Sequence, residues 1–177
     1  NARDLSDATF RLVDQLFGTY GLVILEPNKK NLKSIFTPVV KEELIYQKTL
    51  KYVTKQIEQI KDKYNKNYIP QVNPREINLF YLTNNGRYRI ERNEKGYFIK
   101  DTDKFYAKKA FLEMLDKFPE DFSPNVILRP IYQEILLPNI CYVGGGGEIS
   151  YWFQLKRNFD HFQIPFPILL IRNSALL

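Results

Sequence analysis

The stretch from Asn139 to Glu148, NICYVGGGGE, constrains the fold most, because a short apolar run meets four glycines and then an acidic residue that opens an amphipathic segment. We interpret it as a strand, a tight loop and a helix. Glycines permit positive φ and let a ligand approach the main chain, while a helix N-terminus favours an anion. The stretch therefore predicts an anion-binding loop at Gly144, Gly145, Gly146 and Gly147.

The same glycines also have a purely structural interpretation, since glycine runs form tight joints between strands and helices. The sequence GGGGE matches neither GxGxxG nor GxxxxGK[ST], and the lysine of a P-loop nucleotidase does not follow it. Glu148 would repel a phosphate unless it faces elsewhere, and it could instead bind an amine or a hydroxyl. The sequence alone leaves both interpretations open.

A chain of 177 residues suits one domain with a real core. Its apolar runs are far shorter than the ~20 residues of a membrane span. A secretory signal pattern is not apparent, and the single Cys141 has no partner for an internal disulfide, so we expect a reducing cytoplasm. Asn1-Ala2 resembles a tag remnant, and we expect an excised piece of a longer protein.

The formal net charge of +6 raises the possibility of a nucleic-acid partner. The lysines of the segment 41–63, however, alternate with acidic residues, as on a solvated helix face. We therefore expect no nucleic-acid partner. No cluster of metal-ligating residues is evident in the sequence, so we expect no metal site.

Apolar spacing predicts helices over residues 6–17, 32–64, 102–118, 130–137 and 148–162. In the first, Phe10, Val13, Leu16 and Phe17 should face inward. The second contains Pro38 and a narrow apolar seam whose members are Tyr46, Leu50, Val53, Ile57, Ile60 and Tyr64. This seam should pack within the protein. His161, the only histidine, is expected on the surface or as a helix cap.

Three short apolar runs, at about 22–25, 140–143 and 168–171, are typical of buried parallel strands. Between them, residues 77–100 form an antiparallel meander whose tightest turn is Asn84-Asn85-Gly86. The exposed Arg87, Arg89 and Arg92 of the meander could grip a carboxylate or phosphate, or could solvate an edge strand. The patterns predict an α/β fold whose parallel strands are neighbours, with the meander outside.

The order of motifs, FSPNVILRPIYQEILLPNICYVGGGGEISYWFQLK and then PFPILLIRNSALL, resembles that of the bacillithiol biosynthesis cysteine-adding enzymes. The resemblance covers about 5–177 and rests on RP-x-x-QE, Y-V-G-G-x-G-E and the final R-x-S. The family usually has proline where this chain has Gly146, and often proline where it has Ile171, so the loop is expected to be looser here.

The resemblance implies a Rossmann-like core related to class I synthetases, formed by 3–71 and 102–177 and interrupted by the meander insert 72–101. It further implies a ligase that joins L-cysteine to glucosaminyl-malate, a site for ATP or another adenine nucleotide, and a coiled coil that makes the parent protein a homodimer. The fragment alone is expected to be inactive. Two rival hypotheses are an adenylyl-transfer domain like those of class I synthetases and a non-catalytic binding or scaffold domain.

The expected site is one edge where two parallel strands end. Its members are Gly144, Gly145, Gly146, Gly147, Glu148, Arg172, Asn173 and Ser174, with Arg129 and Gln133 in second rank. Arg172 would bind a carboxylate or phosphate, the loop amides would bind anionic oxygens, and Glu148 would bind an amine such as that of cysteine. Alternatively, Arg172 pairs with Glu148 only to tie two loops together. Arg129 could likewise form a buried salt bridge or orient a substrate carboxylate.

Overall fold

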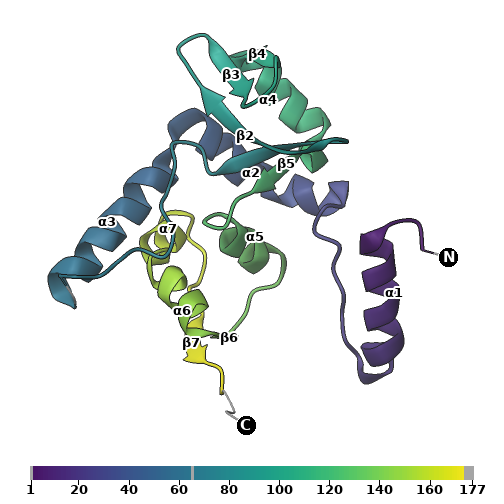
Figure 1. Cartoon of the computed structure of the whole chain (residues 1–177), viewed down its shortest axis with the longest axis vertical. Coiled ribbons are helices and arrows are strands. Elements are labelled where there is room, and N and C mark those ends of the chain that lie inside the picture. Colours follow the sequence, from purple (N-terminus) through teal and green to yellow (C-terminus); the bar gives the residue numbers. More distant parts are fainter. Residues whose placement is uncertain (1, 65, 174–177) are drawn as a thin grey trace.

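The computed structural model describes residues 2–64 and 66–173, so Asn1 and the predicted site residue Ser174 lie outside the described residues (Figure 1). The helices are α1 (Leu5–Phe17), α2 (Lys30–Tyr46), α3 (Lys48–Lys63), α4 (Lys108–Lys117), α5 (Arg129–Leu136), α6 (Gly146–Phe153) and α7 (Lys156–His161), with short η1 (Gly18–Tyr20) and η2 (Pro119–Asp121). The strands are β1 (Leu79–Thr83), β2 (Gly86–Arg92), β3 (Gly96–Ile99), β4 (Phe105–Ala107), β5 (Phe122–Pro124), β6 (Cys141–Gly144) and β7 (Ile168–Ile171). Helices and strands alternate from α4 onward, as in an α/β fold, whereas α1 to α3 and then β1 to β4 follow one another in two runs.

The meander is present and forms an antiparallel sheet of order β4-β3-β2-β1-β5. Its predicted turn is confirmed in position, since Thr83 pairs with Gly86 across Asn84 and Asn85. The positive φ of 150° belongs to Gly86. One face of the sheet packs on α4, where Phe111 and Leu115 are fully buried.

The predicted helix 102–118 begins later than expected. Residues 105–107 instead form β4, which pairs with β3, and α4 starts at Lys108. The helix pattern of the sequence was therefore wrong over its first turn, because pairing with β3 competes with helix formation there. β5 also joins the sheet beside β1, with Phe80 opposite Ser123.

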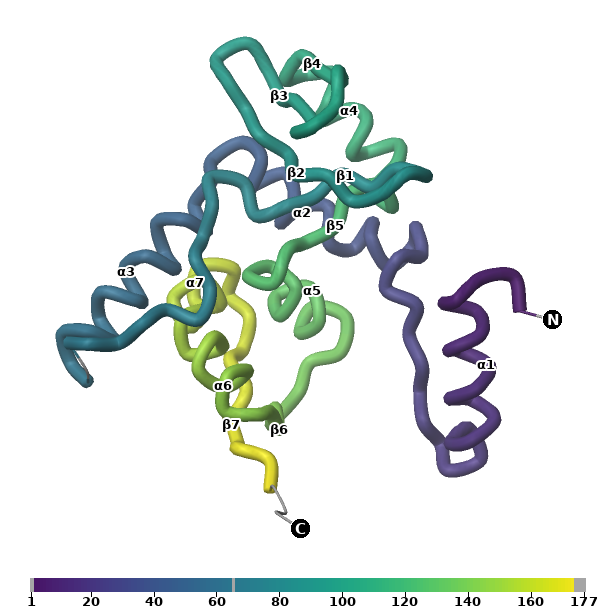
Figure 2. Tube along the Cα trace, in the orientation of Figure 1, coloured from purple at the N-terminus to yellow at the C-terminus, as the bar shows by residue number. Residues whose placement is uncertain are grey.

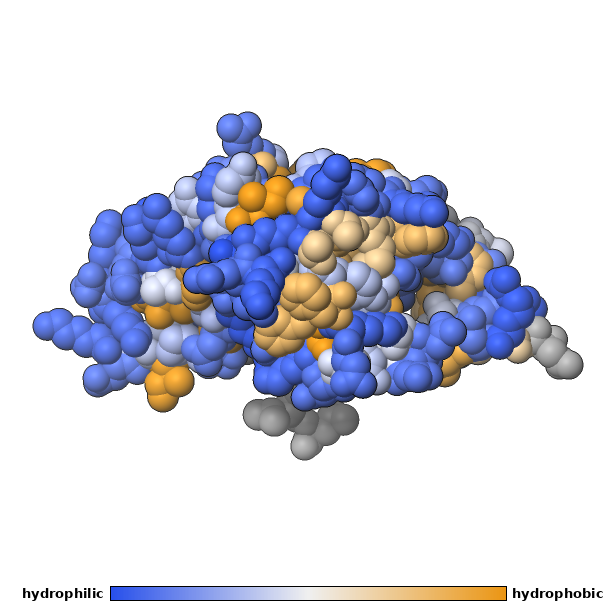
Figure 3. Space-filling view, turned by 90° about the horizontal axis from the view of Figure 1, so that it is seen from above, coloured by the Kyte–Doolittle hydropathy of each residue, from blue (hydrophilic) through white to orange (hydrophobic). Residues whose placement is uncertain are grey.

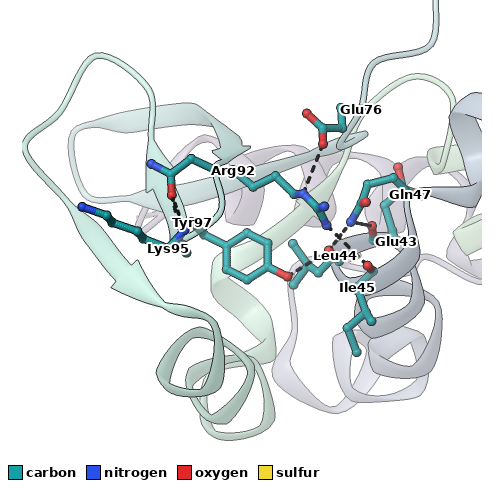
Figure 4. Close-up of polar contacts among 10 residues, drawn as sticks. Glu43, Leu44, Ile45, Gln47, Glu76, Arg92, Lys95 and Tyr97 are labelled. Atoms are coloured by element: carbon teal, nitrogen blue, oxygen red, sulfur yellow. Dashed lines mark hydrogen bonds and ion pairs between the residues drawn. The ribbon is translucent and has the colours of Figure 1, made fainter.

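The long predicted helix is divided at Gln47, which takes the left-handed conformation with φ 48° and ψ 37°. Pro38 lies inside α2. The last carbonyl groups of α2 find donors from the break itself and from the meander (Figure 4): Gln47 Nε2 donates to Leu44 O, Tyr97 Oη donates to Leu44 O at 2.8 Å, and Arg92 Nη1 donates to Ile45 O at 3.4 Å. These bonds fix the corner between α2 and α3 to the sheet.

The apolar seam is buried only at its centre. Val53, Ile57 and Ile60 lie in the interior, against α7, whereas Tyr46 and Tyr64 are 62% and 80% exposed. The prediction that the seam packs within the protein is confirmed for its middle and wrong for Leu50, which is 36% exposed, and for its ends. Tyr46 lies on α2, before the break at Gln47, and Tyr64 lies just past the last turn of α3.

The two later parallel strands are confirmed. β6 pairs with β7 in parallel, from Cys141 opposite Ile168 to Gly144 opposite Ile171, and this pair is separate from the meander. The strand predicted at 22–25 is wrong, since these residues carry no strand pairing and Val23 is 72% exposed. Figure 2 shows this segment running beside α1, apart from β6 and β7. Apolar residues alone do not make a strand when no neighbouring strand is in reach.

α1 has its predicted bounds but not its predicted burial. Asp4 caps it by accepting the Asp7 N–H at 2.8 Å, yet none of the helix residues is buried. The expectation that Phe10, Val13, Leu16 and Phe17 face a core is therefore wrong for the described residues.

The predicted helix 148–162 is two helices, α6 and α7, separated at Gln154. The buried Gln154 side chain accepts the Gln71 N–H at 2.8 Å and donates to Val72 O at 2.8 Å. This amide therefore holds the segment before the meander against the end of α6. Trp152 and Phe159, one from each helix, fill the interior between them with ring centroids 5.7 Å apart.

Figure 3 shows one face of the molecule, on which hydrophilic side chains dominate and apolar ones form scattered patches. Among the described residues, no helix combines the length and the apolar character needed to cross a membrane. A cluster of three or more His, Cys, Asp or Glu suited to a metal ion is also absent from residues 2–64 and 66–173.

Candidate functional site

The glycine loop is shorter than its sequence suggests. β6 ends at Gly144 and α6 begins at Gly146, which leaves Gly145 as the joint. None of the four glycines has a positive φ, so that part of the prediction is wrong. Two of them are needed for close packing instead. A Cβ on Gly144 would lie 2.8 Å from Tyr142 Cε1, and a Cβ on Gly145 would lie 3.2 Å from Arg172 Nη2.

Gly146 and Gly147 occupy the first turn of α6 and face open space, since a Cβ on either would meet no atom within 4 Å. The bare backbone of this turn is therefore reachable from solvent. In an α-helix the first N–H groups have no partner within the helix, and they suit an anionic oxygen.

Glu148 turns back onto the loop. Its Oε2 accepts the Gly145 N–H at 2.8 Å, and its Oε1 accepts the Tyr142 hydroxyl at 3.3 Å. The bond from Gly145 is the largest cause that holds the pKa of Glu148 below its usual value, and the charges of Arg172 and Arg129 add to it. Glu148 is therefore a helix-capping carboxylate that occupies one amide of the loop.

Arg172 follows β7 directly. Its backbone N–H donates to Gly144 O at 2.9 Å and so extends the parallel pairing by one bond. Its guanidinium group lies over Gly145, which has no side chain to obstruct it. Within the described part of the chain Arg172 and Glu148 form no ion pair, although the charge of Arg172 acts on the Glu148 carboxylate. Asn173 comes next in the chain and is exposed.

The two second-rank residues lie on α5. Arg129 is its first residue and is exposed, so the buried salt bridge that the sequence left open is not formed. Its charge nevertheless reaches Glu148. Gln133 is half-buried and donates to Glu134 Oε1 at 3.3 Å. Glu148 and Arg172 thus both lie against Gly145, and the charge of Arg129 at the start of α5 acts on the Glu148 carboxylate.

Glu134, a polar residue among apolar neighbours on α5, fixes the approach to β6. It is 2% exposed, and its carboxylate accepts Asn139 N–H and Nδ2, both at 2.8 Å. This carboxylate therefore ties the end of α5 to the start of the strand that leads into the glycine loop.

A buried polar chain that sequence reasoning missed holds the other end of α5. Glu43 Oε1 accepts both the N–H and Nδ2 of Asn78, at 2.9 and 2.8 Å. Asn78 Oδ1 accepts Asn125 Nδ2 at 3.0 Å, and Asn125 Oδ1 accepts the Ile127 N–H at 2.9 Å. Burial raises the pKa of Glu43. The sequence signals this buried chain only through Glu43, a polar residue within the apolar pattern of its helix.

His161 is not a surface or capping residue. Its Nε2 bonds the Glu42 carboxylate, and its ring stacks on Tyr52 with centroids 4.3 Å apart. It joins α7 to α2 and α3, a tertiary role that sequence spacing does not reveal because its partners lie far away in the chain.

A groove of about 850 Å³ lies between α3 and the α6–α7 pair, with Ile60, Phe153 and Phe166 in its apolar wall. The polar groups at its rim pair with one another, since Arg157 donates to Gln59 at 2.6 Å and Lys156 bonds Asp160. None of the ligand-binding residues predicted from the sequence lines it, although Ile60 and Tyr64 of the apolar seam do. We therefore place the candidate site at the glycine loop, with Gly144–Glu148, Arg129 and Arg172, and call it the glycine-loop edge.

A parallel strand pair joined to a following helix by a glycine-rich turn is the local geometry of a Rossmann-like α/β domain. Residues 1–173 match the family described as "Bacillithiol biosynthesis BshC, N-terminal Rossmann-like domain", and the chain belongs to this family. The proposed resemblance is thereby confirmed.

Relatives with the provisional name "cysteine ligase BshC" support the same assignment. The protein of Flavobacterium johnsoniae is 52% identical over 98% of this chain, that of Christiangramia forsetii 47% over 98%, and that of Cytophaga hutchinsonii 38% over 95%. The chain spans 32% of the length of each of these relatives.

Proposed function

We propose that the protein to which this chain belongs is a ligase that adds L-cysteine to glucosaminyl-malate in bacillithiol biosynthesis. The observation that carries this proposal is the family match over residues 1–173, together with the position of Glu148 and Arg172 against Gly145 at the glycine-loop edge. The reaction would form a carbon–nitrogen bond between the carboxyl carbon of cysteine and the amine nitrogen of the acceptor.

In this proposal Arg172 and Arg129 bind the anionic groups of the substrates, because guanidinium forks match carboxylate and phosphate oxygens. The open first turn of α6 offers further donors. Glu148 is ionised and holds the loop through Gly145, which leaves its remaining acceptor capacity for an amine. Asn173 and Gln133 flank this edge, and Ser174 lies outside the described residues.

ATP or another adenine nucleotide would supply the activation of the carboxyl group. The Rossmann-like class of the domain supports this choice, because such domains commonly bind nucleotides where parallel strands end. Pyrophosphate exchange measured with the complete enzyme and cysteine tests it. Exchange that is independent of cysteine would favour the rival adenylyl-transfer hypothesis.

The remaining parts of the proposal concern the whole protein. We expect a homodimer in the cytoplasm, and we expect the fragment to be inactive because it spans only 32% of its relatives. The unpaired, half-buried thiol of Cys141 suits a reducing compartment. Sedimentation of the complete protein checks the homodimer, and cell fractionation checks the cytoplasmic location. Cysteine addition by the isolated fragment would contradict the expectation that the fragment is inactive.

Deletion of the parent gene is the direct test of the activity. Cells should lose bacillithiol and accumulate the cysteine-free precursor, as seen by mass spectrometry of their thiols. Unchanged thiol levels would show that the ligase proposal is wrong.

The role of Arg172 is tested separately in the complete enzyme. Arg172→Ala should weaken substrate binding by about tenfold or more, roughly 1.4 kcal/mol, while the melting temperature stays unchanged. Loss of stability without loss of affinity would show that Arg172 only ties two loops together.

A scaffold role would place the partner surface on the seam of α3. Alanine at Ile57, which is 8% exposed, should destabilise the fold because it empties a core position. Loss of a protein partner with unchanged stability after Leu50→Ala or Ile57→Ala would favour the scaffold hypothesis.

A further inference from the structure

Two cationic side chains from distant parts of the chain meet at β5. Lys33 of α2 is 3% exposed and donates from Nζ to Phe122 O at 2.7 Å. Arg87 of β2 donates from Nη2 to Pro124 O at 2.6 Å. Carbonyl groups two residues apart on a strand point to the same side and lie about 7 Å apart. Lys33 and Arg87, the cation pair, are therefore neighbours.

The cation pair has no opposite charge of its own. Within residues 2–64 and 66–173, neither Lys33 nor Arg87 takes part in an ion pair. Lys33 uses one of its three N–H bonds on Phe122, and Arg87 has five N–H bonds of which one goes to Pro124. Donors are therefore left over on both side chains.

Each of the two cations lies against an aromatic ring. Lys33 Nζ lies 5.5 Å from the centroid of the Tyr132 ring, and the Arg87 guanidinium lies 4.1 Å from that of Phe80. Such contacts offset part of the cost of removing a cation from water but supply no negative charge. Burial and the charge of Arg87 lower the pKa of Lys33 to about 8. A bound anion would relieve both effects.

We propose that the cation pair of Lys33 and Arg87 binds an oxyanion, the carboxylate or phosphate group of a small molecule, at the edge formed by Phe122 and Pro124. The carbonyl oxygens to which Lys33 and Arg87 donate lie about 7 Å apart, so the remaining N–H donors of the two side chains can converge on the oxygens of one such group at hydrogen-bond distance. Arg87 is exposed and forms the entrance, while Lys33 forms the buried end.

This oxyanion site differs from the glycine-loop edge. It is built from α2, β2 and β5, whereas the glycine-loop edge is built from β6, β7, α5 and α6. It does not depend on the ligase proposal, since anion binding is measured without any reaction. The purely structural alternative is that Lys33 and Arg87 only satisfy the carbonyl groups of Phe122 and Pro124.

Calorimetric titration of the complete protein at low ionic strength and pH 7 separates the two accounts. The probes are inorganic phosphate and L-malate, a dicarboxylate. Saturable binding of phosphate alone would indicate a phosphorylated ligand, binding of malate alone a carboxylate ligand, and binding of both a site for either group. Each of these results supports the proposal if the variants described next weaken the binding. Absence of saturable binding of both probes would overturn it.

Arg87→Gln should weaken binding by about tenfold, the effect of one lost charge-assisted hydrogen bond. Arg87→Lys should restore part of the lost affinity, and Lys33→Met should also weaken anion binding. Lys51→Gln is the matched control, because Lys51 is exposed on α3 and its loss changes the net charge equally. Since Arg87 is exposed, its variants remain informative even if Lys33→Met fails to fold. Equal binding by wild type and Arg87→Gln would contradict the oxyanion site.

Discussion

Glu148 accepts the backbone N–H of Gly145 at 2.8 Å, so the acidic residue at the head of α6 is bonded to the joint that precedes its own helix. The same joint carries the guanidinium group of Arg172 on its open side. Gly145 therefore lies between the Glu148 carboxylate, which accepts its N–H, and the Arg172 guanidinium group, which has room there only because glycine has no side chain. The geometry of the glycine-loop edge depends on both.

Gly145→Ala should displace Arg172, because the added Cβ would lie 3.2 Å from Nη2. In the complete enzyme we expect kcat/KM for cysteine addition to fall by about tenfold, the scale of one charged hydrogen bond. Gly146→Ala is the matched control, since a Cβ there meets nothing within 4 Å. It should lose less activity than Gly145→Ala and gain up to about 1 kcal/mol of helix stability. Equal activities of the two variants would contradict this role of Gly145.

The cap formed by Glu148 should depend on pH. Its pKa in the folded protein is held below the ordinary value of 4.5, so its ionised form stabilises the fold above pH 4.5, and this stabilisation is lost as pH falls through the lowered pKa. Glu148→Gln should therefore melt below wild type at pH 7, and the difference should close at low pH. Thermal melts at both pH values measure it. Glu58→Gln, an exposed site on α3, should show no such convergence.

The buried chain from Glu43 through Asn78 to Asn125 should be costly to break. Glu43→Ala removes the acceptor of two Asn78 donors, and we expect a loss of roughly 2–4 kcal/mol of unfolding free energy. Urea unfolding measures this loss. Glu43→Gln keeps an acceptor oxygen without charge, so it should cost less. A loss of equal size for both variants would show that the charge of Glu43, and not its hydrogen bonds, matters.

Lys33 should make stability rise with pH. Its pKa is lowered from 10.5 to about 8 on folding, so between these values the unfolded chain binds the extra proton. The protonated, buried Lys33 destabilises the fold fully below pH 8, and this destabilisation decreases as pH rises towards 10.5. The advantage of Lys33→Met over wild type should therefore shrink by at most roughly 3 kcal/mol across this window.

Urea unfolding at pH 7 and pH 10.5 tests this expectation for Lys33. The groups that face it do not titrate within the window: Arg87 stays charged, and burial raises the pKa of Tyr132 to about 12. A difference between wild type and Lys33→Met that is constant with pH would contradict the expectation.

Local signals in the sequence were sufficient for most elements. The turn at Asn84 and Asn85 and the parallel strands that end at Gly144 and Ile171 follow from short-range patterns, and the structure has both. These patterns work because turn residues and apolar runs act within a few positions of the chain.

Long-range partners explain what was missed. Gln47 takes a left-handed conformation that sequence does not favour for glutamine, and side chains from the meander complete that corner. The strand predicted at 22–25 has no neighbour in the described residues, and β4 exists only because β3 is beside it. For the site, the sequence indicated Arg129, Glu148 and Arg172, but not the buried Glu43 that positions α5. The proposed binding roles and domain boundaries stay predictions.

The place of β5 in the sheet has a consequence for the order of folding. β1 to β4 are joined by hairpins, whereas Leu79 meets Pro124 only after α4 has been traversed. Closing so long a loop costs entropy before its contacts form, so we expect the hairpins to precede β5 in the folding transition state. Phe122→Leu should then accelerate unfolding more than it slows folding, as stopped-flow kinetics would show. Asn125 and the carbonyl groups of Phe122 and Pro124 would take their places last, so binding competence would appear only with the final closure of the sheet.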